Sequence, residues 1–118
     1  MKQEDKELLL KDICSRLPYK VKCKYYDCCE GDYDEGVICG FERKEYIQID
    51  GVCIHIEEVK PYLFPLSSMT EEQQLFYSTH LNYMPYYQRV DWFNEHHLDY
   101  RDLIPMGLAL DATGLNIY

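Results

Sequence analysis

The sequence predicts an α+β fold: an N-terminal helix, a small, strongly bent antiparallel sheet of four or five strands, and two or three C-terminal helices packed on that sheet. Two observations predict this order. Apolar and polar residues alternate over 21–25 and 52–56, which is the period of a strand. After Pro61 and Pro65 the apolar residues follow helical spacing over 68–97. A small sheet must cover its apolar face, and these helices are the nearest segments able to do so.

The first helix is expected over Glu4–Leu17. Leu9, Ile13 and Leu17 follow the spacing of one helical face, and Pro18 ends the helix because proline disfavours helical geometry in the residue before it. Such a helix could plug one end of a barrel or cover an open sheet edge.

The sheet is expected to begin at Val21 and to continue beyond an acidic loop. The loop spans 27–36, and the next strands span 37–42, 45–49 and 52–56. Asp50-Gly51 predicts a two-residue hairpin turn, since both residues tolerate positive φ. The segment 58–63 is expected to be an edge strand or a tight turn, because Pro61 cannot donate to a ladder.

The helical part is expected to begin with a capping box in which Ser68 pairs with Glu71. That helix would run to about Met84, and a second would span 86–97. Asp99 and Asp102 predict a further short helix start, which Gly107 would end. The apolar C-terminal tail is expected to dock on the rest of the chain.

At 118 residues the chain is expected to form one domain over 1–118, with the leading helix and a small β-barrel-like sheet in 1–66 and a helical cover in 67–118. The strand lengths and the hairpin resemble a Src-homology-3-like or Tudor-like barrel. This is an analogy of pattern and implies no function.

The charge is acidic and unevenly distributed. The formal net charge is −9, and residues 69–118 contain 2 basic and 7 acidic side chains, against 10 and 14 in 1–68. Lys and Arg dominate binding to phosphates, so nucleic-acid binding is not expected. An acidic surface keeps a small protein soluble, and the sharper alternative is an acidic nucleic-acid mimic.

The sequence predicts neither a membrane-spanning segment nor a leader peptide. No apolar run approaches the ~20 residues of a spanning helix, and the N-terminus is charged throughout. We therefore expect a cytoplasmic protein with no membrane partner. Its six cysteines include no Cys-x-x-Cys pair, so free thiols are expected, with Cys23, Cys39 and Cys53 packed within strands. An incidental metal site or a redox role stays an alternative.

His96-His97, beside Glu95 and Asp99, is the place to look for metal or acid–base chemistry. Adjacent residues on a helix diverge by about 100°, so the two imidazoles cannot easily share one ion. Both are therefore only weak metal candidates. The chain also lacks a nucleophile elbow and a glycine-rich phosphate loop. No catalytic residue, cofactor or metal is predicted.

Aromatic residues gather between and within the two helices of the last third: Tyr83, Tyr86, Tyr87 and Trp92. Tyrosine is enriched at interfaces because it combines contact area with a polar tip. A small protein also uses tyrosine to complete its core. These four residues are the candidate partner-binding set, with a core role as the alternative.

Several short segments carry a resemblance. They are 59–63, 65–72, Asp91-Trp92 with Asn94 and His96-His97, Asp99-Tyr100-Arg101, Leu103-Ile104 and 107–110. They resemble a family of short hypothetical proteins that recurs in gut bacteria and in their phages and prophages. The resemblance covers roughly residues 7–23 and 52–115. The family has no assigned activity, so the resemblance implies a phage or mobile-element context and no functional residue.

Taken together, these observations favour a non-enzymatic protein-binding or adaptor protein. One alternative is a metal-dependent hydrolase that uses His96 or His97. The other is an acidic nucleic-acid mimic that inhibits a host enzyme.

Overall fold

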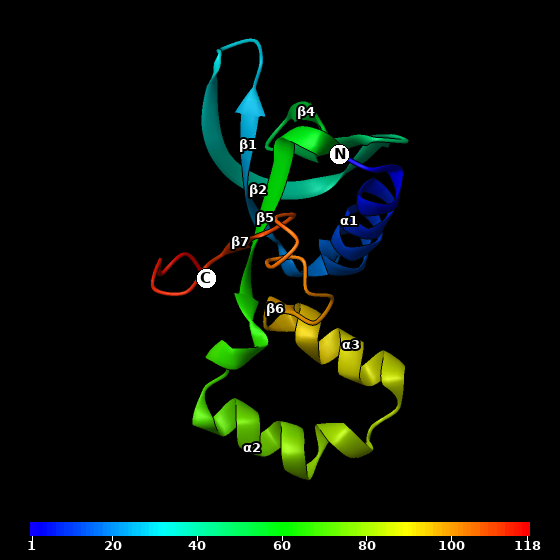
Figure 1. Cartoon of the computed structure of the whole chain (residues 1–118), viewed down its shortest axis with the longest axis vertical. Coiled ribbons are helices and arrows are strands. Elements are labelled where there is room, and N and C mark those ends of the chain that lie inside the picture. The colour runs from blue at the N-terminus through cyan, green and yellow to red at the C-terminus, as the bar shows by residue number, and fades with distance from the viewer.

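The computed structural model describes residues 1–118 (Figure 1). Its helices are α1 (Gln3–Arg16), α2 (Glu71–Thr79) and α3 (Tyr86–Glu95). Its strands are β1 (Lys22–Asp27), β2 (Asp32–Arg43), β3 (Tyr46–Ile49), β4 (Val52–His55), β5 (Val59–Pro65), β6 (Leu98–Asp99) and β7 (Leu110–Asp111). Four short 3-10 turns connect them: η1 (Leu17–Tyr19), η2 (Ile56–Glu58), η3 (Leu66–Ser68) and η4 (Leu81–Tyr83). The α+β class, the leading helix and the later helices are confirmed.

The sheet is open and mixed. Its strand order is β4-β3-β2-β1-β5-β6, and β7 also pairs with β5. The pairs β4–β3, β3–β2, β2–β1 and β1–β5 are antiparallel, whereas β6 and β7 run parallel to β5. The prediction of a purely antiparallel sheet is therefore wrong, because the C-terminal segment adds two short parallel strands. The Src-homology-3-like or Tudor-like barrel is not confirmed, since no ladder joins β4 to the other end of the sheet.

The long strand β2 bends and serves both parts of the sheet. Its first half pairs with β1 and its second half with β3, from Ile38 opposite Ile49. Gly36 lies just before the change of partner, and a Cβ there would come within 2.6 Å of Asp50 Oδ2 and 2.7 Å of Ile49 Cγ2. Only glycine permits this close approach of the β3–β4 turn.

The sequence predicts the β3–β4 turn correctly but not the β1–β2 hairpin. The Asp50-Gly51 turn is confirmed, with φ of 46° and 84°. The expected loop over 27–36 is wrong, because β1 and β2 pair up to Asp27 and Asp32. The rings of Tyr26 and Tyr33 meet edge to face with centroids 5.2 Å apart, which stabilises this end of the hairpin despite its acidic residues.

Strand β5 is central, which corrects the expectation of an edge strand or turn. Pro61 pairs with Cys23 of β1 on one side, and the ladder to β7 starts one residue later, at Tyr62. The proline thus lies where β5 has a registered neighbour on one side only, which is where a missing donor is tolerated.

The core lies between α1 and the sheet. Leu9 and Ile13 of α1 pack on the buried faces of the strands, and Leu103, Leu108 and Ala109 of the C-terminal segment complete the cluster. The core therefore joins residues from both sides of Pro65. Cys23 is buried in it, whereas Cys39 and Cys53 are exposed on the outer face, so their predicted packing is wrong. All six thiols are free.

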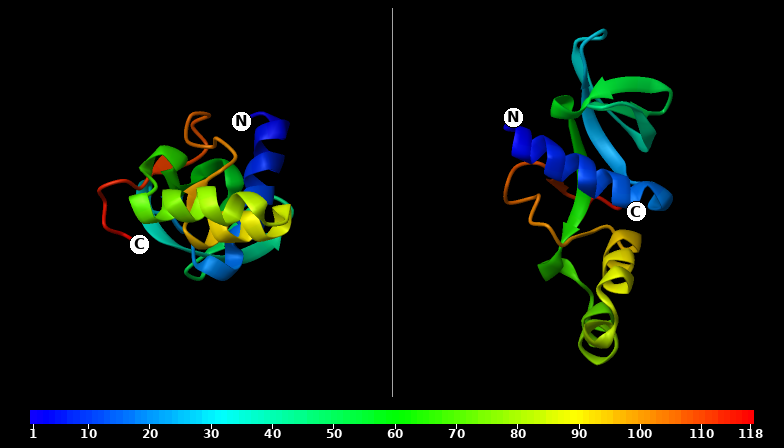
Figure 2. Two further views of the ribbon diagram at one scale, coloured as in Figure 1. Left: turned by 90° about the horizontal axis from the view of Figure 1, so that it is seen from below. Right: turned by 90° about the vertical axis from the view of Figure 1, so that its right-hand side faces the viewer.

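Helices α2 and α3 form a projecting helical arm, which we define as residues 69–97 (Figures 1 and 2). Helix α2 has no buried residue, and the molecule measures 48 × 28 × 24 Å. The prediction that the later helices cover the sheet is thus wrong for α2. Its large apolar residues, Leu75, Phe76 and Tyr77, are consecutive, so they spread around the helix and form no stripe that could lie on a sheet.

The ends of the arm helices also differ from expectation. The capping box is formed by Thr70 and Gln73, while Ser68 lies in η3 and donates to Pro65 O. Helix α2 ends at Thr79, not near Met84, because η4 follows.

No helix starts at Asp99 or Asp102, although both were expected to start one. Asp99 is buried, and its carboxylate accepts from the amides of Leu103 and Ile104, both at 2.9 Å, which stabilises a run of turns. The C-terminal tail does dock as predicted: Tyr118 donates to Tyr62 O at 2.8 Å.

Candidate functional site

A buried ion pair anchors the base of the helical arm to α1. Arg16 and Asp12 are both fully buried, with Nε–Oδ2 at 2.8 Å and Nη2–Oδ1 at 3.1 Å. The same Nη2 donates to the carbonyl of Leu98, just beyond the arm, at 2.7 Å. A buried charge is tolerated only when paired in this way, so the pair fixes where the arm leaves the body.

Further polar contacts reinforce this base. Arg101 donates to Asp12 Oδ1 at 2.7 Å, and Asn94 of α3 donates to the carbonyl of Ser15 at 3.2 Å. Tyr19 also donates to the carboxylate of Asp91 on α3. Helix α3 is therefore held firmly by polar contacts.

Helix α2, in contrast, meets α3 through aromatic rings. Phe76 stacks on Trp92 with centroids 5.7 Å apart, and Tyr77 lies 6.1 Å from Phe93. Phe76 and Trp92 belong to a longer stack of rings. His80 stacks on Phe76 with ring centroids 5.3 Å apart, and His96 stacks on Trp92 with centroids 4.5 Å apart. We call these four rings, His80, Phe76, Trp92 and His96, the ring column.

The structure places three of the four predicted partner-binding residues together at the end of the arm. Tyr83 lies in η4, and Tyr86 and Tyr87 begin α3, with exposed fractions of 82%, 69% and 70%. We call these three residues the tyrosine tip. Trp92 is separate from them, because it lies half-buried in the ring column.

The two histidines lie in different surroundings. His96 Nδ1 is 3.0 Å from the carbonyl of Trp92, which can only accept, so this nitrogen carries the proton. His97 has a φ of 57° and stacks on Tyr118 at 3.7 Å. Burial, with the nearby charge of Arg16, lowers the pKa of His97 to about 4. Neither imidazole belongs to a group of three or more His, Cys, Asp or Glu that could hold a metal ion.

The arm also carries an open hollow of about 370 Å³, which we call the arm hollow. It is lined by Thr70, Glu72, Gln73, Phe76, Trp92 and His96. A smaller space of about 160 Å³ shares Thr70, Gln73 and His96 with it and extends toward Phe64 and Leu98. Of these lining residues, Thr70, Glu72, Gln73 and Phe76 are not predicted as site residues from the sequence. The i, i+4 spacings of Phe76 with His80 and of Trp92 with His96 are the signal that could have indicated the column.

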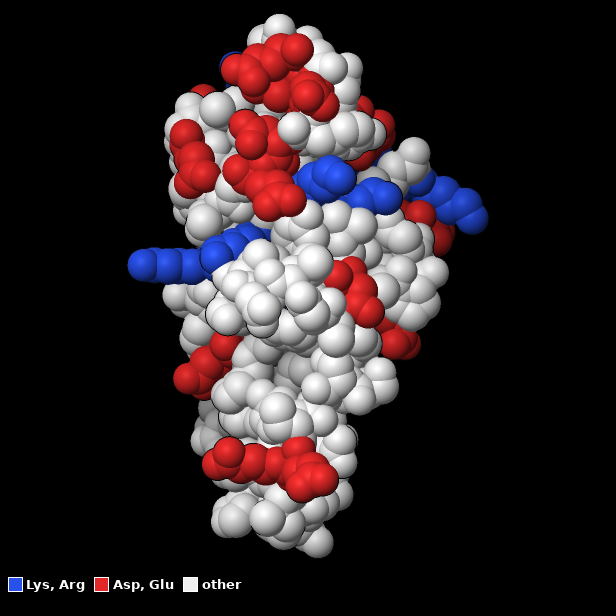
Figure 3. Space-filling model, turned by 90° about the vertical axis from the view of Figure 1, so that its left-hand side faces the viewer, with Lys and Arg blue, Asp and Glu red and all other residues white.

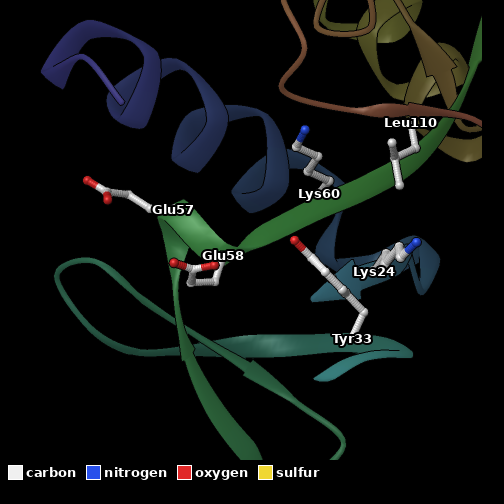
Figure 4. A pocket seen from close by; sticks show the side chains of 6 residues that line it. All are labelled: Lys24, Tyr33, Glu57, Glu58, Lys60 and Leu110. Atoms are coloured by element: carbon white, nitrogen blue, oxygen red, sulfur yellow. The ribbon is translucent and has the colours of Figure 1, made fainter. Parts of the chain in front are cut away.

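A second hollow, of about 270 Å³, lies on the body (Figure 4). Lys24 and Lys60 are register partners on β1 and β5, and Tyr33 also lines the hollow, with 63% of its surface exposed. The two lysine side chains point in different directions, and Glu57 is paired with Lys6 at 2.7 Å. Figure 3 shows that Lys and Arg form a band across this face, with acidic groups beyond it on both sides. Because the ammonium groups do not converge, the helical arm is the better candidate site.

Comparison with known protein families, with curated proteins and with solved structures finds no match for this chain. Within the structure, none of the helices has the length and apolar character that crossing a membrane requires.

Proposed function

We propose that this chain is a non-enzymatic protein-binding or adaptor protein whose partner binds the helical arm. The observation that carries the proposal is the exposure of the arm: α2 has no buried residue, and the tyrosine tip is more than two-thirds exposed.

Exposed rings of this kind fit an interface. A tyrosine buries roughly 150–250 Å² when fully covered, so the three rings of the tip offer a substantial part of a standard interface. Tyrosine loses little conformational entropy on binding, because it has only two side-chain torsions. The anchored base adds rigidity, since Asn94 holds α3 to Ser15 of α1 and Arg16 holds Leu98, which follows the arm. A rigid surface binds at a lower entropic cost than a mobile one.

We propose that the bent β2 and the strand order β4-β3-β2-β1-β5 form an open relative of the Src-homology-3-like or Tudor-like barrel. We also propose a phage or mobile-element origin, which the sequence resemblance supports, and action in the cytoplasm, to which the six free thiols are suited.

The two other hypotheses stay predictions. The hydrolase requires His96 or His97 to bind a metal, and His97 is engaged in stacking on Tyr118. The nucleic-acid mimic requires a carboxylate array, and residues 81–88, which include the tyrosine tip, contain no Asp or Glu. Neither is favoured by the arrangement of the arm.

The proposal is tested by affinity enrichment from a lysate of the source cells, followed by quantitative mass spectrometry. The bait is compared with the triple variant Tyr83→Ala, Tyr86→Ala, Tyr87→Ala. Tyr33→Ala is the matched control, because Tyr33 is similarly exposed but lies on the body. We expect a protein that is enriched by the natural chain and by the control and is reduced about tenfold or more with the triple variant. Equal enrichment by all three baits would contradict the proposal.

A further inference from the structure

We infer that an open groove between α1 and the end of β2 binds an acidic peptide segment of a protein partner, in which apolar side chains are flanked by carboxylates. We call this feature the α1–β2 groove. It lies on the body, so the inference goes beyond the proposed binding at the helical arm and does not depend on it.

The α1–β2 groove combines apolar and cationic side chains. Its space of about 380 Å³ is lined by three residues of α1 and by three at the end of β2 or just after it: Leu10, Lys11, Cys14, Phe41, Arg43 and Lys44. Leu10 and Phe41 are half-buried and pack against the hydrophobic core. Because these two side chains continue the core, they are held in place before a ligand arrives, which lowers the entropic cost of binding.

The charge of this lining is opposite to that of the chain as a whole. All three charged residues of the groove are cations, although the formal net charge of the chain is −9. The hollow beside Lys24 and Lys60 differs, because Glu57 and Glu58 also line it. No ion pair of the structure involves a cation of the groove. The three positive charges are therefore free to pair with an anionic partner.

The carboxylates that are close in sequence to these cations have other partners. Glu7 accepts from the side-chain amide one turn earlier in α1, at 3.5 Å. Glu42 forms a hydrogen bond with the thiol of Cys53 on β4, and Glu45 lies 3.2 Å from His55 Nε2. None of the three carboxylates lines the groove. Exposed charges are screened beyond about 8 Å at physiological ionic strength, so the cations of the groove dominate its local attraction.

This combination selects an acidic peptide that also carries apolar side chains. Leu10 and Phe41 gain from contact with an apolar side chain, which a small inorganic anion could not supply. The guanidinium of Arg43 lies 6.0 Å from the centroid of the Tyr46 ring, and a guanidinium can pair with a carboxylate in two-point geometry. Carboxylates on both sides of the apolar residues would reach the cations contributed by α1 and by β2.

The binding is tested by NMR on the isotope-labelled full chain at low salt. The probe is an acetylated, amidated octapeptide, Gly-Asp-Glu-Leu-Phe-Asp-Glu-Gly. One control peptide has Asn and Gln in place of the acidic residues, and the other has Ser-Ser in place of Leu-Phe. We expect saturable shifts of backbone amides within 10–14 and 41–44. Each control peptide should bind about fivefold more weakly or less, and salt should weaken the acidic probe.

Two double variants with the same change in net charge locate the binding. Lys11→Gln with Lys44→Gln removes two cations of the groove and should weaken the acidic probe by about fivefold or more. Lys24→Gln with Lys60→Gln is the matched control, since all four lysines are exposed and this pair lines the other hollow. The control should change binding less than about twofold. Equal binding of the acidic and neutral peptides, or equal effects of the two double variants, would overturn the inference.

Other occupants of the groove would give different results. Shifts of the groove amides with vesicles of anionic phospholipid, but not with the acidic probe, would assign the groove to a lipid surface. Shifts that grow with the concentration of the chain alone would assign it to a second copy. Either result contradicts the inference, as do probe-induced shifts confined to the helical arm. The variants of the tyrosine tip test the arm alone, so failure of the proposed function and failure of this inference are separate results.

Discussion

The imidazole of His97 lies where a positive charge is unfavourable. Its ring stacks on Tyr118, its Nδ1 has no hydrogen-bond partner, and Arg16, His96 and Lys22 are nearby. Burial is the main reason that its pKa falls from 6.5 to about 4. The unfolded chain therefore binds this proton at a higher pH than the folded chain does, so the contribution of His97 is present above pH ~6.5 and is lost as the pH falls toward ~4.

We predict that His97→Asn reduces the dependence of the melting temperature on pH between about 6.5 and 4. Asparagine tolerates the positive φ of this position but does not titrate. The variant should melt lower at pH 7, because the stacking on Tyr118 is lost, while its further decrease toward pH 4 should be smaller than that of the natural chain. His80→Asn is the control, since that ring is exposed. If the melting temperatures of the natural chain and of both variants changed equally with pH, this role for His97 would be excluded.

At the scale of elements, α2 is held more weakly than the strands. It buries no residue, and its ring contacts to α3 involve Phe76 and Tyr77. Isolated helices of nine residues are marginal in water, so these contacts and the Thr70 cap must supply most of its stability.

We predict that amides of α2 exchange faster than those of β1, and that Phe76→Ala increases this difference by about tenfold or more. Phe76→Ala removes the ring that links α2 to Trp92, whereas β1 is unaffected. Hydrogen exchange followed by mass spectrometry measures both segments in one sample. Leu75→Ala is the matched control, because this neighbour is 64% exposed and should leave exchange almost unchanged. Equal acceleration of α2 and β1 by Phe76→Ala would contradict the separate stability of α2.

The elements also show how much the sequence reveals. Local signals predict α1, the Asp50-Gly51 turn and α3 well, because periodicity and turn chemistry act over a few residues. Ser68 and Thr70 are each followed three residues later by a Glu or Gln that could complete a capping box. Because Ser68 lies in η3, Thr70 is the residue that caps α2. The parallel pairing of β6 and β7 with β5 could not be predicted, since two-residue strands carry no periodic pattern.

At the scale of the whole molecule, a mixed-charge body supports an acidic arm. The sequence predicts the change of period near Pro65 and the tyrosine cluster after it. It does not predict that the arm projects, because this depends on Arg16 reaching Leu98 O and on Asn94 reaching Ser15 O, contacts between residues about 80 positions apart. The exposure of the tip and the formation of the arm hollow both follow from that placement.

The measurement that tests arm binding most directly is site-specific photo-crosslinking in the source cells. Tyr86→p-benzoylphenylalanine places the crosslinker at the tyrosine tip, and Tyr33→p-benzoylphenylalanine places the same group on the body at similar exposure. The proposal predicts a discrete crosslinked protein at position 86 and none at position 33. No adduct at position 86, or the same adduct at both positions, would contradict it.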